Sequence, residues 1–113
     1  MNGDKNYLRK YLSAMRRNNY TKIKTELFKV LPGNKIGACA AGQAILNLGI
    51  VTDEEVLASK SDRALRRDLN GRAIDWISAH LPYNTFSTTY NLNDGTDLSV
   101  SEIADELERR YLF

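Results

Sequence analysis

The chain has 113 residues, of which 42% are hydrophobic and 27% charged, a composition typical of one globular domain and unlike that of a disordered segment. One cysteine excludes an internal disulfide and favours a reducing compartment, and no stretch approaches the roughly 20 apolar residues that span a bilayer. Because the polar N-terminus also lacks the apolar core of a signal peptide, we expect a single domain over residues 1–113, in the cytoplasm, without membrane contact.

The formal net charge of +2 hides an asymmetry. Residues 1–35 contain nine Lys or Arg and two acidic residues, a net charge of +7, whereas residues 36–113 contain seven basic and twelve acidic residues, a net charge of −5. A basic segment of this kind indicates a nucleic acid or an acidic partner surface. The alternative is that the two halves neutralise each other in the fold, and no groove-reading motif accompanies the basic segment.

Apolar residues recur at helical spacing over residues 4–17, where Asp4 suits the N-cap position, so we predict a first helix there. Residues 20–31 fit either a strand or a short helix, and residues 32–34 (Pro-Gly-Asn) predict a turn. A second helix is predicted over residues 38–48. Its residues are apolar or small all round, which indicates burial, and the small ones would let another backbone approach closely.

Gly49 suits the residue that ends this helix. Thr52 and Glu55 have the spacing of a capping box, which predicts a short helix ending near Ser59. A charged stretch follows over residues 63–68.

Asn70-Gly71 predicts a turn after the charged stretch. A further helix is predicted over residues 72–81, because Pro82 would end it. The side chains expected to anchor it in the core are Ile74, Trp76, Ile77 and Leu81.

Residues 83–92 are rich in β-branched and aromatic types and favour a strand or an irregular packed segment, and residues 93–95 (Asn-Asp-Gly) predict a turn. A second capping box, Ser99 with Glu102, predicts a last helix. Its apolar face would contain Val100, Ile103, Ala104, Leu107 and Tyr111. The fold class predicted is therefore mainly α: a compact bundle of four to five short helices, with room for one small β-hairpin or extended segment.

Two segments carry a resemblance to known proteins. One is Gly-Ala-Cys-Ala-Ala-Gly at residues 37–42, and the other is Leu-Asn-Asp-Gly at residues 92–95, followed by Ser-x-x-Glu-Ile-Ala-Asp-x-Leu-Glu at residues 99–108. The chain resembles a group of short, functionally uncharacterised proteins of bacteriophages and their bacterial hosts. It departs from them in having Cys-Ala-Ala-Gly at residues 39–42, where the group commonly has Cys-Cys-Leu-Gly. The resemblance implies a phage-type accessory protein, located in the host cytoplasm if viral, and it implies no reaction.

A catalytic interpretation would centre on Cys39, which lies near the start of a predicted helix, where the helix dipole lowers a thiol pKa. His80, the only histidine, and then Asn91 and Asn93 follow Cys39 in the chain order of papain-like sites. They would act as the base and the orienting residue of a Cys39-dependent hydrolase. Cys39 equally suits a small core residue, and His80 a cation at a helix end, so we predict no catalytic residues.

We expect instead a non-enzymatic protein that binds a host or viral macromolecule, a protein in the first instance, as a monomer or a homodimer. Its binding face should combine basic residues of the first helix with tyrosines such as Tyr7, Tyr20 or Tyr83. The binding residues predicted are Arg16, Arg17, Tyr20, Lys22, Lys24, Trp76, Asn93 and Asp94. For the last three, the competing interpretation is structural, with Trp76 in the core and Asn93 and Asp94 capping backbone amides.

Two further functions stay open. The first is binding of a small anionic ligand, such as a nucleotide signal, by Lys22, Lys24, Arg66 and Arg67 in a pocket of roughly 300 Å³ or more. The second is binding of nucleic acid through the basic N-terminal third, which would weaken steeply with salt. The sequence has neither metal-ligand spacing nor a phosphate-binding loop, so no metal and no cofactor are predicted.

Overall fold

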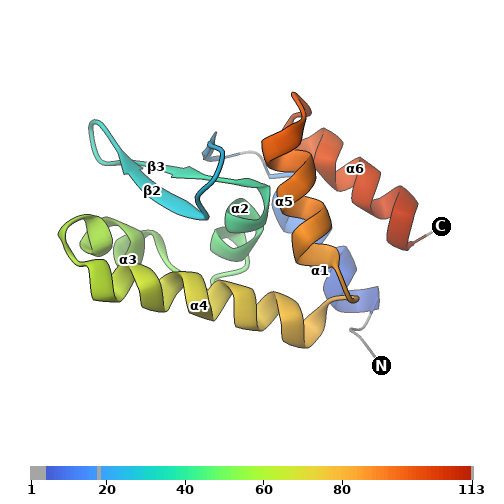
Figure 1. Cartoon of the computed structure of the whole chain (residues 1–113), viewed down its shortest axis with the longest axis horizontal. Coiled ribbons are helices and arrows are strands. Elements are labelled where there is room, and N and C mark those ends of the chain that lie inside the picture. Colours follow the sequence, from blue (N-terminus) through green and yellow to red (C-terminus); the bar gives the residue numbers. More distant parts are fainter. Residues whose placement is uncertain (1–4, 18, 113) are drawn as a thin grey trace.

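The computed structural model describes residues 5–17 and 19–112, so the predicted N-cap Asp4 lies outside the described residues. The protein is mainly α, as the sequence predicts. The described residues form six α-helices where four to five were predicted, and one small three-stranded sheet where a hairpin or extended segment was predicted. Its elements, in chain order, are α1 (Lys5–Met15), β1 (Thr21–Lys22), β2 (Phe28–Leu31), β3 (Lys35–Ala38), α2 (Ala40–Asn47), α3 (Asp53–Ala58), the 3-10 turn η1 (Ser59–Ser61), α4 (Arg63–His80), α5 (Thr85–Gly95) and α6 (Val100–Tyr111). Helix α4 runs along one long side of the molecule, and α5 turns away from its C-terminal end (Figure 1).

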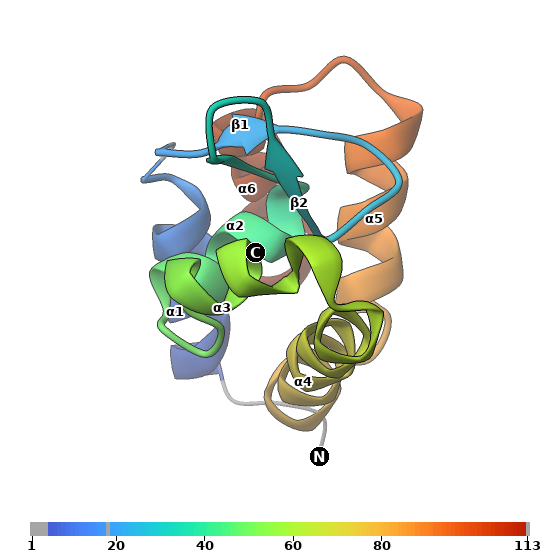
Figure 2. The ribbon, with the colours of Figure 1, turned by 90° about the vertical axis from the view of Figure 1, so that its left-hand side faces the viewer.

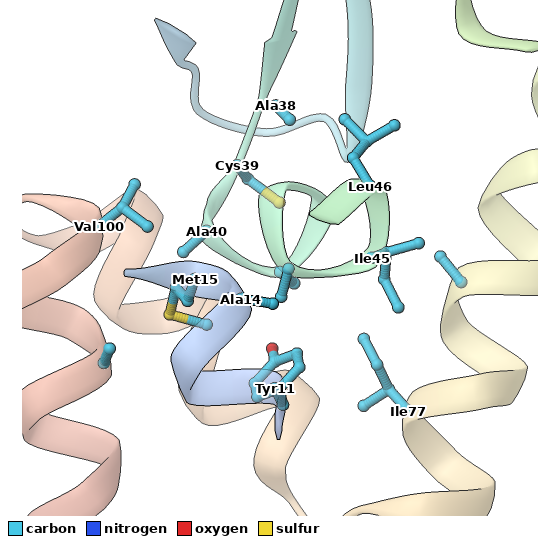
Figure 3. Close-up of a cluster of buried hydrophobic side chains, with 14 of the residues drawn as sticks. Tyr11, Ala14, Met15, Ala38, Cys39, Ala40, Ile45, Leu46, Ile77 and Val100 are labelled. Carbon is cyan, nitrogen blue, oxygen red and sulfur yellow. The ribbon is translucent and has the colours of Figure 1, made fainter. Parts of the chain in front are cut away.

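The core lies around α2, whose apolar or small residues make burial on all sides favourable. Figure 3 shows Tyr11 and Met15 of α1, Ile45 of α2, Ile77 of α4 and Val100 of α6 directed into one buried cluster. Burial of this apolar surface is the main force that holds the helices together. The predicted close approach of another backbone to α2 is confirmed at Gly42.

Gly42 of α2 lies against the backbone of the segment that precedes β2. A Cβ atom at this position would clash with the carbonyl oxygen of Leu27, so only glycine fits there. This contact fixes the segment between β1 and β2 against the start of α2.

The sheet has the order β1-β3-β2, with β1 parallel and β2 antiparallel to β3. The ambiguous stretch 20–31 therefore forms two strands and no helix, and residues 32–34 make the predicted turn of a hairpin. Strand β3 was not predicted. It occupies the start of the helix predicted over residues 38–48, because Ala38 pairs with Phe28 of β2, and the helix begins at Ala40 instead.

The predicted end of α2 and the predicted starts of α3 and α6 are confirmed. Gly49 has φ +76, which a glycine adopts without strain. Thr52 with Glu55 and Ser99 with Glu102 form both predicted capping boxes. The predicted face of α6 is also correct: Val100, Ile103, Ala104 and Leu107 are buried, and Tyr111 packs against the core.

Four predictions between residues 63 and 95 are wrong. Asn70-Gly71 is no turn, because Leu69, Ala73 and Ile77 are buried at helical spacing and their packing keeps α4 continuous. Ile74 is no core anchor, since 37% of it is exposed. Residues 83–95 form neither a strand nor an Asn-Asp-Gly turn. Residues 85–95 are helix α5, which has an unusual pattern of side chains.

Candidate functional site

Helix α5 has polar side chains on its buried face. Its fully buried residues are Thr85, Thr89 and Asn93, at intervals of four. The hydroxyl of Thr85 donates to the carbonyl of Pro82 (2.6 Å), and that of Thr89 donates to the carbonyl of Thr85 (2.7 Å). The Tyr11 hydroxyl of α1 donates in turn to Thr89 Oγ1 (3.1 Å), and burial raises the pKa of that tyrosine, so it stays neutral. These hydrogen bonds help to hold α5 on the core, together with the apolar contacts of Phe86 and Leu92.

Asn93 is the most connected residue of this buried face. Its Oδ1 accepts from the amide of Ala40 at the start of α2 (2.9 Å), and its Nδ2 donates to the carbonyl of Ile23 (2.9 Å) and to Asp94 Oδ1 (2.9 Å). The amide of Thr25 also donates to Asp94 Oδ1 (3.1 Å). The two residues thus join α5 to α2 and to the segment between β1 and β2, which reaches toward α5 in Figure 2.

Two tyrosines at and just before α5 are exposed, beside the exposed polar residues Ser87 and Asn91. Tyr83, just before the helix, is 75% exposed and Tyr90 is 48% exposed. Phe86, which is half-buried, lies between them in the chain and stacks on Tyr90 with ring centroids 6.2 Å apart. We call these three residues the α5 aromatic face. Since a solvent-facing helix surface normally carries polar residues, an exposed stripe of rings indicates a binding surface.

Two hollows flank Phe86. The larger, of about 320 Å³, lies at the corner of α4 and α5, where Ile77, Leu81 and Tyr83 contribute to its wall. The smaller, of about 60 Å³, has Leu27, Cys39, Tyr90 and Asp94 in its wall. Phe86 lines both, so the hollows and the aromatic face form one continuous surface.

Thr25, at the rim of the smaller hollow, has a strained backbone. Its φ of 69° is in the left-handed region, which a β-branched residue rarely occupies. Such strain costs on the order of 1–3 kcal/mol and concentrates at functional sites. The hydrogen bond from its amide to Asp94 holds it in place. The strained backbone of Thr25 therefore lies beside the α5 aromatic face.

Cys39 is buried and is the N-cap of α2, where its Sγ accepts from the amide of Gly42 (3.5 Å). Burial raises the pKa of the thiol more than the nearby backbone amides lower it, so the thiolate is disfavoured. Asn93 lies close by through its bond to the amide of Ala40. The described contacts of His80 are elsewhere: its Nδ1 bonds the carbonyl of Trp76 (2.9 Å), and its ring packs on those of Trp76 and Tyr7. The structure thus brings Cys39 and Asn93 close together and places His80 in another cluster.

Most predicted binding residues near the N-terminus contact the protein itself. Arg16 pairs with Asp105 (2.7 Å) and Glu108 (3.0 Å) of α6, and these carboxylates raise the pKa of the guanidinium. The other internal donors are Arg17, to the carbonyl of Asn47 (3.1 Å), Tyr20, to Asp53 (2.6 Å), and Lys22, to the carbonyl of Leu98 (2.7 Å). Lys24 is exposed. The basic N-terminal segment and the acidic α6 therefore neutralise each other in part, which is the structural alternative considered above.

A second, smaller aromatic cluster contains Tyr7, Trp76 and His80, with the Lys10 ammonium 5.3 Å from the centre of the Tyr7 ring. It combines a basic residue of α1 with an aromatic one, as predicted for the binding face. Even Tyr7, however, is only 37% exposed, and the rings pack on one another. We regard it as secondary to the α5 aromatic face.

Within residues 5–17 and 19–112, no group of three or more His, Cys, Asp or Glu side chains could hold a metal ion. In the same residues, no helix combines the length and hydropathy that crossing a membrane requires. A third hollow of about 320 Å³ lies near the sheet, with Tyr20, Lys35 and Asp53 in its wall.

Comparison with protein-family models, curated proteins and solved structures finds no match for the chain. The likeness to short phage and bacterial proteins therefore remains a resemblance, carried by the two segments in which Cys39 and Asn93 lie. The residues of the surface that sequence reasoning missed are Phe86 and Tyr90. Their signal is the spacing of Phe86 and Tyr90 by four residues, which places these two rings on one face of a helix.

Proposed function

We propose that this chain is a non-enzymatic accessory protein, of the phage type that its resemblance implies, which binds a partner protein through the α5 aromatic face. One observation carries the proposal: α5 buries the polar side chains of Thr85, Thr89 and Asn93, whereas Tyr90 on the same helix and Tyr83 just before it are exposed. Folding alone would favour the reverse arrangement, since burying rings releases free energy and burying hydroxyls does not. A partner that covers the rings accounts for the pattern.

Proteins are the class of partner that this face suits best. Tyrosine and phenylalanine are enriched in protein interfaces, where their large rings contribute much of the binding free energy. The 320 Å³ hollow beside Phe86 is large enough to receive a side chain of the partner. Among the described residues that line the two hollows, none is Lys or Arg, whereas binding to nucleic acid depends on such cations.

Quantitative co-purification from a bacterial lysate tests the proposal. Wild-type protein, the double variant Tyr83→Ser/Tyr90→Ser and the control variant Tyr7→Ser are compared as equally folded baits. The control removes an exposed tyrosine from the other cluster. We expect proteins enriched by the wild type to be enriched equally by the control and at least about tenfold less by the double variant, in line with loss of interface hot spots. Equal enrichment by all three baits would contradict the proposal.

The three alternative functions have less support. Nucleic-acid binding has less support because Arg16, Arg17 and Lys22 form hydrogen bonds within the protein. Anionic-ligand binding has a suitable volume in the hollow near the sheet, but the carboxylate of Asp53 shares that wall with Lys35. A Cys39-dependent hydrolase would need a reactive thiolate, and burial disfavours it.

A further inference from the structure

We propose that the partner segment bound by the α5 aromatic face is an amphipathic helix whose apolar anchors are flanked by Lys or Arg. This inference rests on the function proposed above and adds the chemistry of the partner.

The charges around the face favour a cationic partner. The wall of the smaller hollow contains the carboxylates of Glu26 and Asp94, and the described wall of the larger hollow contains no charged residue. Among the described residues, neither wall contains Lys or Arg. In the sequence, α5 and its connection to α4 (residues 81–95) contain Asp94 as the one charged residue and no Lys or Arg. Exposed rings with carboxylates beside them select a segment that has apolar anchors with basic neighbours, because mismatched charges lower affinity.

The shape of the face favours a helix. The larger hollow is enclosed by α4, α5 and their connection, and the smaller by the β1–β2 segment and α5. Partner strands bind by pairing with the edge of a sheet, and α5 offers its side chains rather than such an edge. A helix laid in a groove instead inserts side chains at intervals of three, four and seven residues, which suits two hollows on either side of Phe86.

A second copy of this chain is a poorer occupant. Two α5 faces in contact would bring Glu26 and Asp94 of one copy near the same carboxylates of the other, without a described cation in either face to pair with them. Like charges in an interface suppress association. The test therefore includes the homodimer as an outcome.

The experiment uses two synthetic helical peptides with identical leucine positions, one with Lys and the other with Glu at every polar position. Each is titrated into the isotopically labelled full chain, and amide chemical shifts report both the affinity and the site. Three proteins are compared: wild type, Glu26→Lys, and the control Glu54→Lys, which reverses an exposed charge on α3, away from α5 (Figure 1). Thermal unfolding confirms that each variant is folded.

We expect the Lys peptide to shift the amides of residues 83–94 and to bind at least about tenfold more tightly than the Glu peptide, a typical effect of charge mismatch. Glu26→Lys should lower the affinity for the Lys peptide several-fold and raise the affinity for the Glu peptide. Glu54→Lys should change neither affinity. Equal binding of both peptides at residues 83–94 would overturn the charge preference and leave the α5 aromatic face as the proposed binding surface. Shifts confined to the acidic α6, or concentration-dependent shifts at residues 83–94 without peptide, would overturn the inference in favour of charge alone or of a homodimer.

Discussion

Helices α5 and α6 are neighbours of nearly equal length, 11 and 12 residues, but they use their side chains in opposite ways (Figure 1). α6 buries Ile103 and Leu107 and exposes charged residues, the usual arrangement of a helix on a core. α5 buries Thr89 and Asn93 and exposes Tyr90. The arrangement of α6 is explained by folding. That of α5 is explained only when a role for its outer face is added.

The two helices also begin differently. Ser99 of α6 accepts from the amide of Glu102 (3.1 Å), and the Glu102 carboxylate accepts from the amide of Ser99 (2.8 Å). The bond from the Ser99 amide lowers the pKa of the Glu102 carboxyl, so the ionised form favoured in this capping box is present at neutral pH. Asn84, at the same position of α5, has φ 67° and makes no such side-chain bond with a described residue. Thus α6 is stabilised by its own sequence, and α5 by the partners that surround it.

The largest effect is expected from the apolar interior of α6. Leu107 is fully buried, so Leu107→Ala should lower the free energy of unfolding by about 3 kcal/mol through lost burial and the cavity left behind. Urea titration followed by circular dichroism measures this. Arg109→Ala, on the exposed side of the same helix, is the control and should change the free energy of unfolding by less than about 0.5 kcal/mol. A loss below about 1 kcal/mol for Leu107→Ala would show that α6 does not depend on its apolar face.

The polar interior of α5 should come next. Asn93→Ala leaves the buried amide of Ala40 and the carbonyl of Ile23 without a partner, which should cost about 2 kcal/mol in the free energy of unfolding. Asn91→Ala is the matched control, since it makes the same change on the exposed side of the same helix. The same urea titration compares the two. If Asn93→Ala were as stable as Asn91→Ala, hydrogen bonds would not be what holds α5 on the core.

A smaller effect is expected at the helix starts. Ser99→Ala removes the hydroxyl that caps α6 and should cost about 1 kcal/mol in the free energy of unfolding. Asn84→Gly at the start of α5 should cost nothing, because its side chain caps no described amide and glycine adopts a positive φ freely. Thermal unfolding of the two variants gives the ranking, and an Asn84→Gly loss equal to that of Ser99→Ala would remove this difference between the helices.

The different side-chain patterns of α5 and α6 also decide how much of each helix could be predicted from the sequence. In α6 the capping box, the propensities and the apolar spacing all agree, so the helix and its face were predicted correctly. In α5 the buried positions are held by Thr85, Thr89 and Asn93, whose types favour strands and turns, so the pattern indicated the wrong structure. Tertiary contacts supply what the local pattern lacks, such as the bond from Tyr11 to Thr89 across 78 residues.

The candidate site was predicted in part for the same reason. Asn93 and Asp94 were singled out by their residue types, and they lie at the base of the surface. Arg16 and Lys22 were selected by charge, but whether a cation faces solvent or a carbonyl depends on packing that composition does not encode. Phe86 and Tyr90 could be placed on one surface only after residues 85–95 were known to be helical.

An effect on stability smaller than that of Ser99→Ala should come from the face itself. Tyr83 is 75% exposed, so Tyr83→Ser should change the free energy of unfolding by less than about 0.5 kcal/mol, as surface substitutions usually do. Tyr11→Ser, which removes a fully buried ring, should cost about 3 kcal/mol or more and serves as the contrast in the same urea titration. A loss above about 1 kcal/mol for Tyr83→Ser would mean that this ring serves folding after all. Because the comparison of α5 with α6 depends on rings that the fold does not require, that result would remove the main reason for assigning α5 a partner.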